Sequence, residues 1–403
     1  MDDKRKRQQA ERQKYARIQR YIRMGAIALA LVLAIIALVQ GCSTRKAIND
    51  LAAQLREKKI AEAQAELQAL TVSPSPSPSP EPAAEDSSIT LSFVGDCTLA
   101  QAEDGGSFED YYSQYGASYF FGNVKSVFEG DDLTVANLEG TFTTSENRAD
   151  KTYTFKADPS HVSILTGSGI DVVNVANNHT HDYGDESYVD TLANLDKAGI
   201  GRFGYENTLI QTVNGIRVGF TGICEYSDEE KSIDYLSPIL ENIQTLKDQD
   251  AQIIIAVVHW GYENATVPEE TQISAAHAMI DRGADLVIGH HSHTLQGVEC
   301  YQGKYIAYSL GNFCFGGNDS PSDMDTVILQ QTFTVSGGEC LKYAELTLIP
   351  CSISSSTGYN DFRPTIAEGD EGQRILDKVF ARSGELDGGI VAEDVADYDG
   401  DTY

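Results

Sequence analysis

Apolar stretches with the length and flanking residues of buried β-strands recur along the chain from residue 88 onward. The first stretch, SITLSFVGD, covers residues 88–96 and ends in Gly-Asp. Similar stretches follow at 132–139, 170–178, 216–223, 252–260, 285–291 and 305–313. Amphipathic patterns with helical spacing separate several of them, at 187–198, 238–249 and 269–282. Strands that alternate with helices predict a layered α/β domain.

The pattern changes toward the C-terminal end. Residues 325–335 and 340–349 alternate apolar and polar positions, which is typical of antiparallel strands. Residues 371–382 have the pattern of a closing helix, so we place the globular domain at 89–384. Residues 385–403 hold no Lys or Arg and seven acidic residues, and this composition predicts a disordered acidic tail.

An uncharged apolar run at residues 24–40 predicts a membrane anchor. Together with the two residues before Arg23 it approaches the ~20 residues that a membrane-spanning helix needs. Residues 1–23 hold nine Lys and Arg, so the positive-inside rule predicts a cytoplasmic N-terminus, a single pass through the cell membrane and an extracytoplasmic domain. The sequence VQGC leaves a second anchor open, a lipoprotein attached at Cys42.

Two segments join the predicted anchor to the domain. Residues 43–72 are rich in Ala, Glu, Lys and Leu and lack Gly and Pro, which predicts a helical stalk with at best a short, imperfect coiled coil. This stalk could pair with a second copy of the chain or with subunits of a membrane synthase, and a solvated helix is the equal alternative. Residues 73–88 begin with SPSPSPSPEP, whose alternating prolines predict a stiff, extended linker.

Charge is distributed unevenly along the chain. The formal net charge is −30, and from residue 71 onward 16 basic residues stand against 53 acidic ones. Such an acidic body repels phosphate backbones, so we expect no nucleic-acid partner. It also repels a polyanionic substrate at long range unless cations intervene.

The cysteines have no metal-binding spacing. Six remain besides Cys42, and none forms a CxxC pair, so a zinc ribbon is excluded. Outside the cytoplasm disulfides are possible, for instance among Cys300, Cys340 and Cys351.

Several predicted strands end in side chains that can bind a metal. In layered α/β folds the carboxyl ends of the strands converge on one edge, so these side chains are expected to meet. A mixture of carboxylate, amide and imidazole groups suits a divalent ion such as zinc, manganese or iron. The candidates are Asp96, Asn137, Glu139, Asn177, Asn178, His179, Asp182, His259, His290, His291 and His293.

The His-rich segment after the sixth apolar stretch contains an H-x-H pattern. On an extended backbone His291 and His293 point to the same side and His290 to the opposite side. This alternation favours His291 and His293 as ligands and His290 as a packing residue.

Six segments resemble, in order and spacing, the capsule synthesis protein CapA family, which is associated with bacterial poly-γ-glutamate. They cover much of residues 89–382 and read FVGDCTLA, VANLEG, VANNHTHDYG, VVHWGYE, DLVIGHHSHTLQGVE and YIAYSLGNF. This family looks like a divergent branch of the calcineurin-like metallophosphoesterases. The resemblance therefore implies an α/β/β/α sandwich with a metal site that holds one or two divalent ions.

Roles for individual residues follow from the resemblance. It implies that His179 gives a proton to a leaving group and that Asp182 orients His179. It implies six metal ligands, Asp96, Glu139, Asn178, His259, His291 and His293.

Two positions depart from the superfamily's pattern. Its first motif is Asp-x-His, whereas this chain reads Asp96-Cys97-Thr98, and Glu139 stands where the superfamily has Asp. The missing His weakens one metal position, and the longer Glu side chain changes the spacing between two ions. One ion or two, and catalysis or its absence, therefore stay open.

Two functions follow as expectations. The first is metal-dependent hydrolysis or transfer at a phosphoester or γ-glutamyl amide bond of an anionic envelope polymer such as poly-γ-glutamate. The second is a non-catalytic polymer-binding or scaffolding subunit of a membrane synthase complex, which the missing motif His favours.

Overall fold

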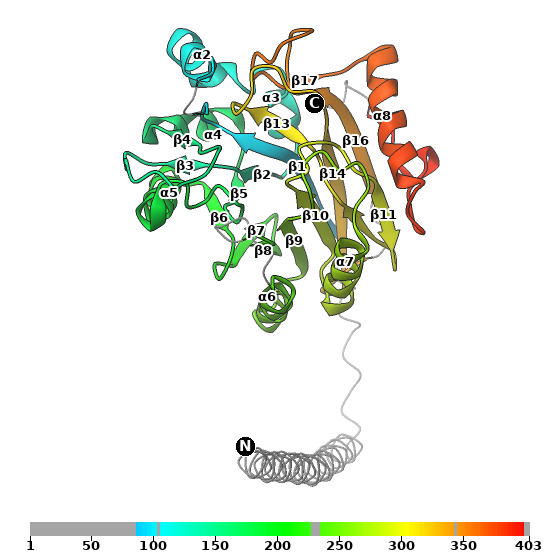
Figure 1. Ribbon diagram of the computed structural model, residues 1–403. Helices are drawn as coiled ribbons and strands as arrows, with labels where there is room; N and C mark the ends of the chain where they lie inside the picture. Colours follow the sequence, from blue (N-terminus) through cyan, green and yellow to red (C-terminus); the bar gives the residue numbers. More distant parts are fainter. Residues whose placement is uncertain (1–85, 103–104, 227–233, 342–344, 399–403) are drawn as a thin grey trace, which may run out of the picture. The chain divides into compact units, whose positions relative to one another are not determined.

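Two β-sheets stacked face to face, with helices on both outer sides, form the domain (Figure 1). The computed structural model describes residues 86–102, 105–226, 234–341 and 345–398. The layered α/β fold with mixed sheets that the sequence predicts is confirmed for these residues.

The first sheet has nine strands, and its main path runs β17-β16-β14-β1-β2-β5-β6, with β13 beside β1 and β15 beside β14. Strand β1 is parallel to β2 and antiparallel to β14, and β14 is antiparallel to β16, as predicted for the C-terminal strands. The strands are β1 (Ser87–Thr98), β2 (Leu133–Leu138), β5 (Val172–Asn174), β6 (Gly201–Phe203), β13 (Asn312–Phe315), β14 (Asp325–Ser336), β15 (Glu339–Cys340), β16 (Glu345–Ser352) and β17 (Thr365–Ile366).

The second sheet has six strands in the order β11-β12-β10-β9-β8-β7. Its four inner strands are parallel, and both edge strands are antiparallel to their neighbours. The strands are β7 (Leu209–Val213), β8 (Ile216–Cys224), β9 (Ile253–His259), β10 (Leu286–His290), β11 (Val298–Tyr301) and β12 (Lys304–Ala307), and a separate pair is β3 (Thr141–Phe142) with β4 (Lys156–Ala157).

The helices cover the outer faces of the two sheets. Helices α2 to α5 lie over the first sheet, α6 and α7 lie over the second, and α8 packs on β16 and β11. Helix α7 begins with a capping box between Glu269 and Gln272, and α5 ends at Gly199 in the left-handed conformation. The helices are α2 (Phe108–Tyr115), α3 (Lys125–Gly130), α4 (Val162–Ser168), α5 (Gly184–Ala198), α6 (Leu236–Asp248), α7 (Glu270–Arg282) and α8 (Gly369–Ser383).

The largest core cluster lies between the two sheets. Phe93 of β1, Ile255 of β9 and Leu286 of β10 belong to it and are almost fully buried. Two further clusters lie under the outer helices, so the central strands are buried on both faces. This double burial explains why these strands read as continuous apolar runs in the sequence.

The acidic C-terminal segment differs from its prediction. Instead of disorder from residue 385, the structure describes residues up to 398, with a short 3₁₀ turn at Ala392–Asp394. Leu386 and Ile390 are buried, and Ile390 N donates to Val298 O. The acidic composition predicted disorder, but the buried side chains of Leu386 and Ile390 hold the segment against the domain despite its negative charge.

Other predictions fall on parts that the structure does not describe. The cytoplasmic segment 1–23, the anchor 24–40 with Cys42, the stalk 43–72 and linker residues 73–85 lie outside the described residues. Among the described residues, no helix combines the length and the apolar character that a bilayer crossing requires. All six cysteines of the described part are free thiols, so the disulfides considered among Cys300, Cys340 and Cys351 are not formed.

Helix α8 is tied to the sheets by a charged network. Asp325 is 8% exposed and accepts two hydrogen bonds from Arg374, at 2.7 and 2.5 Å, and it also pairs with Lys378. Burial would raise the pKa of Asp325, but the contacts with Arg374 and Lys378 outweigh it and lower the pKa below the usual 3.8.

The Asp325→Asn substitution is therefore expected to lower the free energy of unfolding by about 2 kcal/mol at neutral pH. Because the folded pKa is depressed, the contribution of Asp325 is fully present above pH 3.8 and is lost as pH falls through the folded pKa. Denaturant unfolding of both proteins across this range measures the difference. Asp377→Asn, on an exposed position of the same helix, is the control. A difference that does not depend on pH would contradict this role.

Candidate metal centre

The carboxyl ends of strands from both sheets meet at one point of the domain. Asp96 lies on β1, Glu139 follows β2, and His259 ends β9. Within the first sheet Asp96 pairs with Asn137, and within the second His290 pairs with His259. Parallel strands end at the same edge, so these side chains converge, as the strand-end pattern predicts.

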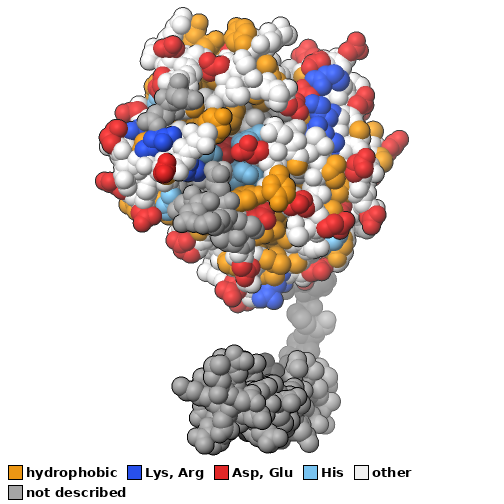
Figure 2. Space-filling model, in the orientation of Figure 1, with side chains coloured by type: hydrophobic (Ala, Val, Ile, Leu, Met, Phe, Trp, Pro, Cys, Tyr) orange, Lys and Arg blue, Asp and Glu red, His pale blue; other side chains and the backbone are white. Residues whose placement is uncertain are grey.

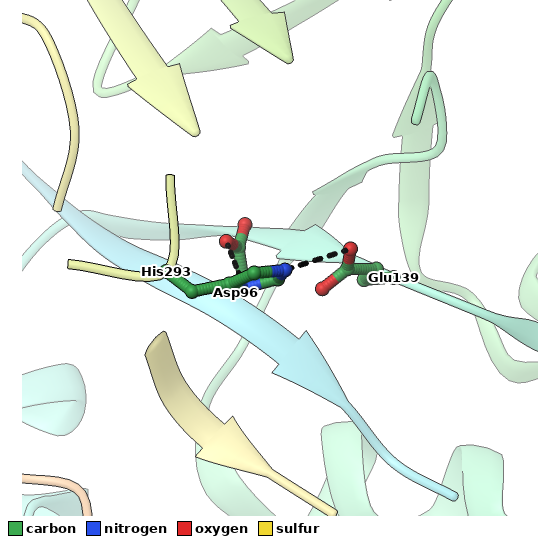
Figure 3. Close-up of side chains that lie close together, drawn as sticks. All are labelled: Asp96, Glu139 and His293. Atoms are coloured by element: carbon green, nitrogen blue, oxygen red, sulfur yellow. Dashed lines mark ion pairs between the residues drawn. The ribbon is translucent and has the colours of Figure 1, made fainter. Parts of the chain in front are cut away.

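The first group of ligand atoms comes from Asp96, Glu139 and His293, whose atoms all lie within 4.8 Å of one another. His293 Nδ1 is 3.4 Å from Asp96 Oδ2, and His293 Nε2 is 4.0 Å from Glu139 Oε1. Figure 3 shows the His293 ring between the two carboxylates. Two buried carboxylates and one imidazole are a ligand set that a divalent ion accepts.

The second group comes from Asn178, His259 and His291. His259 Nε2 is 2.8 Å from Asn178 Oδ1 and 3.0 Å from His291 Nδ1. The same His259 nitrogen is 3.7 Å from Glu139 Oε1. Glu139 therefore faces both groups, and the six residues implied as ligands lie together.

Glu139 provides the test of whether a cation fits. Its Oε1 is fully buried and has no hydrogen-bond partner. Imidazole nitrogens of His179, His259 and His293 surround it at 3.9, 3.7 and 4.0 Å, beyond hydrogen-bond distance. A buried, unpaired carboxylate oxygen costs free energy, and a cation between it and the imidazoles would remove that cost. The residues present therefore fit a divalent ion.

The pKa values divide the histidines into two kinds. Burial lowers the pKa of His291 to about 3 and that of His259 well below its usual value, so both are neutral at pH 7 and offer a lone pair. Burial opposes the charge of His293 too, yet Glu139 and Asp96 raise its pKa to about 10. This position between two carboxylates therefore favours a positive charge.

The two carboxylates also differ in their pKa values. Burial would raise the pKa of Asp96, but contacts with His290 and His293 outweigh it and hold the pKa well below the usual range. Burial raises the pKa of Glu139, whose Oε1 has no donor. Asp96 is thus the stably ionised ligand, and Glu139 is the group that would gain most from a nearby cation.

Neighbouring polar side chains hold the candidate ligands in place. Asn312 Oδ1 is 2.9 Å from His293 Nδ1, and Asn137 Nδ2 donates to Asp96 Oδ1 at 2.8 Å. Thr98, where the resemblance expects a His, instead donates from Oγ1 to Glu139 Oε2 at 3.1 Å. Such contacts fix the orientation of a ligand. Asn137 ends a strand and Asn312 lies in SLGNF, but the sequence does not reveal their partners.

His179 stands at the edge of this cluster, beside a cleft of about 540 Å³. His179 Nδ1 is 2.8 Å from Asp182 Oδ2, as implied for an orienting carboxylate, and His179 Nε2 is 3.9 Å from Glu139 Oε1. Phe155 and Phe315 line the cleft beside His179 and His293. In Figure 2 histidine atoms lie near the centre of the visible face, beside acidic side chains.

The extended backbone assumed for the H-x-H pattern is wrong. Strand β10 ends at His290, and His291 and His293 have φ values of 91° and 55°, in the left-handed region. His290 does not only pack, because its Nδ1 lies 3.2 Å from Asp96 Oδ1. All three histidines therefore face the cluster, since the turn after β10 reverses the alternation of an extended strand.

Comparisons with known proteins agree with this arrangement of motifs. The model of the family described as "Bacterial capsule synthesis protein PGA_cap" matches residues 90–317. The chain is 32% identical over 255 residues to the capsule biosynthesis protein CapA of Bacillus anthracis, covering 57% of this chain and 61% of that protein. It is 33% identical over 249 residues to the PGA biosynthesis protein CapA of Bacillus subtilis, covering 57% and 64%. The chain thus spans less than two thirds of the length of these two relatives.

Two solved structures show a distant likeness to the chain. A hypothetical protein from Thermus thermophilus is 16% identical with a TM-score of 0.41, over 65% of this chain and 99% of that chain. The NAD nucleotidase of Haemophilus influenzae is 14% identical with a TM-score of 0.39, over 79% and 66%.

Proposed function

The chain belongs to the bacterial capsule synthesis protein family PGA_cap, and we propose that it acts in the biosynthesis of poly-γ-glutamate or a related envelope polymer. The proposed activity is metal-dependent hydrolysis or transfer at a bond of that polymer. The names of the CapA relatives support the pathway, and the buried ligand cluster supports the metal. We also propose that the sandwich of two sheets is related in fold to the calcineurin-like metallophosphoesterases.

One observation carries the proposal: Glu139 Oε1, which has no hydrogen-bond partner, faces three imidazoles next to a cleft lined by His179 and His293. Asp96, Glu139 and His293 would hold one ion, and Asn178, His259 and His291 with Glu139 would hold a second. A bound divalent ion supplies Lewis acidity and activates water for attack.

The chain's own residues supply the remaining chemistry. Asp182 accepts from His179 Nδ1, which leaves Nε2 as the nitrogen that can give a proton to a leaving group, and the residue lines the cleft. Phe155 packs against the His179 ring, with ring centroids 4.5 Å apart, and limits its rotation. His179 thus has both a fixed orientation and access to a substrate.

The test is turnover by the full-length protein in membranes or detergent. Protein stripped with a chelator and protein reloaded with zinc, manganese or iron are incubated with poly-γ-glutamate and, separately, with a phosphodiester. Polymer length and phosphate release are the readouts. We expect metal-dependent cleavage of one of them. Metal-loaded protein that cleaves neither and transfers no polymer to an acceptor would refute the catalytic proposal.

Thr98 favours the second candidate function. A hydroxyl that binds Glu139 replaces the imidazole of the superfamily's first motif, so the first group has one ligand fewer. A non-catalytic subunit could use the ion to bridge polymer carboxylates, which offsets repulsion by the acidic surface. Metal-dependent polymer binding without turnover would support this function, and it should survive His179→Ala.

The proposed location is the cell membrane, with residues 24–40 as a single-pass anchor and the domain outside. The stalk at 43–72 would meet a second copy of the chain or synthase subunits. Cys42→Ala separates the two anchors, because a helical anchor predicts that the variant stays in the membrane fraction. Its release into the soluble fraction would instead support the lipoprotein.

A further inference from the structure

A buried lysine that the proposed chemistry does not use contacts the turn that carries Asn178 and His179. Lys151 lies in the irregular segment between β3 and β4, and its side chain is only 7% exposed. Its Nζ donates to Asn178 O at 2.6 Å and to Asp182 Oδ1 at 3.0 Å. A lysine is rarely buried unless it is paired, so this position needs an explanation.

Both acceptors of Lys151 belong to residues of the candidate site. The side chain of Asn178 contacts His259 through its Oδ1, and the carboxylate of Asp182 holds His179. Phe155 N donates to Asp182 Oδ2 at 2.6 Å, and Ala149 N donates to Asp182 O at 2.8 Å. One short segment therefore contacts this turn at several points, and Lys151 contributes a buried charged contact.

The positive charge of Lys151 beside Asp182 has a physical reason. Asp182 is fully buried, and it lies in a cluster that already contains the carboxylates of Asp96 and Glu139. Without the ammonium group, Asp182 would keep a buried charge with one oxygen unpaired, which is strongly unfavourable. Its carboxylate would then move toward water and release His179, and the Asn178 carbonyl would lose its donor.

We propose that Lys151 is a positioning residue that sets both the Asn178 ligand group and the His179 ring. The part that concerns His179 in catalysis rests on the proposed function, whereas the placement of the two side chains does not. Lys151 acts through Asn178 and Asp182, which its Nζ contacts, and is not itself a candidate ligand.

The test compares Lys151→Met, Lys151→Gln and Lys151→Arg with the wild type in the full-length protein. Lys156→Met is the matched control, since Lys156 is a nearby lysine at the start of β4 that binds Ser145 O and Glu146. The first readout is the His179 Nδ1 proton in NMR spectra of metal-free protein, which a hydrogen bond to a buried carboxylate protects from exchange. We expect the signal in the wild type, Lys151→Arg and Lys156→Met, and its loss in Lys151→Met and Lys151→Gln.

The second readout is the visible absorption spectrum of cobalt-loaded protein, which reports ligand geometry without turnover. A changed spectrum in Lys151→Met, restored in Lys151→Arg, supports the placement of Asn178. An unchanged His179 signal and spectrum in Lys151→Met or Lys151→Gln would overturn the proposal. If both variants fail to fold while Lys151→Arg folds, Lys151 serves stability and the proposal also fails. Absence of turnover in the wild type would refute the catalytic function but leave the NMR result valid.

Discussion

His179→Asn is expected to lower kcat by about 10²- to 10⁴-fold while the protein keeps its metal. The substitution removes the imidazole ring that lines the cleft, and the shorter amide side chain keeps the ability to hydrogen-bond near Asp182. The six candidate ligands stay unchanged, so metal content should match the wild type. Steady-state turnover of the cleaved substrate and elemental analysis of the same samples measure the two quantities.

His181→Asn is the matched control for this prediction. His181 lies two residues away on the same turn, but its ring pairs with the exposed Asp185 and not with the cluster. We expect its turnover to stay close to that of the wild type. Equal losses in both variants would indicate a general disturbance of the turn. Wild-type turnover in His179→Asn would show that no proton passes through this ring.

Glu139→Gln is expected to weaken metal binding by at least about 100-fold and to affect both ligand groups at once. Loss of an orienting neighbour alone costs about 10- to 100-fold in affinity, and Glu139 lies closer, as a candidate ligand that faces both groups. The Gln side chain keeps the size of Glu and the bond from Thr98 but loses the negative charge. Calorimetric titration with zinc and manganese measures affinity and stoichiometry.

The stability of the metal-free protein provides a second signature of Glu139. Glu139→Gln removes a buried carboxylate whose Oε1 has no hydrogen-bond donor, but it also removes one of the two carboxylates that face His293, so we expect the stability of the metal-free protein to change by no more than about 1 kcal/mol. Glu299→Gln is the control, since Glu299 is equally buried but bonds to His277 and Tyr308. We expect Glu299→Gln to lose stability and to bind metal normally. If Glu139→Gln instead loses stability and binds metal normally, Glu139 stabilises the fold and is not a metal ligand.

Sequence reasoning located the candidate site because the fold follows from strand periodicity. Asp96, Glu139 and His259 each come at or just after the end of an apolar stretch, and parallel strands bring such ends to one edge. Asn178 and His291 follow further stretches and arrive at the same point. This prediction uses only the position of each residue relative to the end of its own strand, so it does not require the contacts between distant residues.

Two features could not be predicted from the sequence. These are the backbone angles of the turns after the strands and the contacts between residues far apart in the chain. The left-handed φ values at His291 and His293 depend on the turn that follows β10, and the contact of His290 with Asp96 joins strands of two different sheets. Lys151 and Asn178 are 27 residues apart, and nothing in the local pattern of either predicts their bond. The ordered 385–398 segment likewise depends on strands formed much earlier in the chain.

The most direct test of the metal centre is anomalous X-ray diffraction from crystals grown with zinc, manganese or iron, recorded at the absorption edge of the ion. We predict an anomalous peak beside Glu139, within coordination distance of Asp96 and His293, and a second peak beside Asn178, His259 and His291 if two ions bind. The absence of any peak at Glu139 in crystals of the folded, metal-exposed protein would contradict the metal centre. The cluster would then be a network of buried ion pairs and hydrogen bonds.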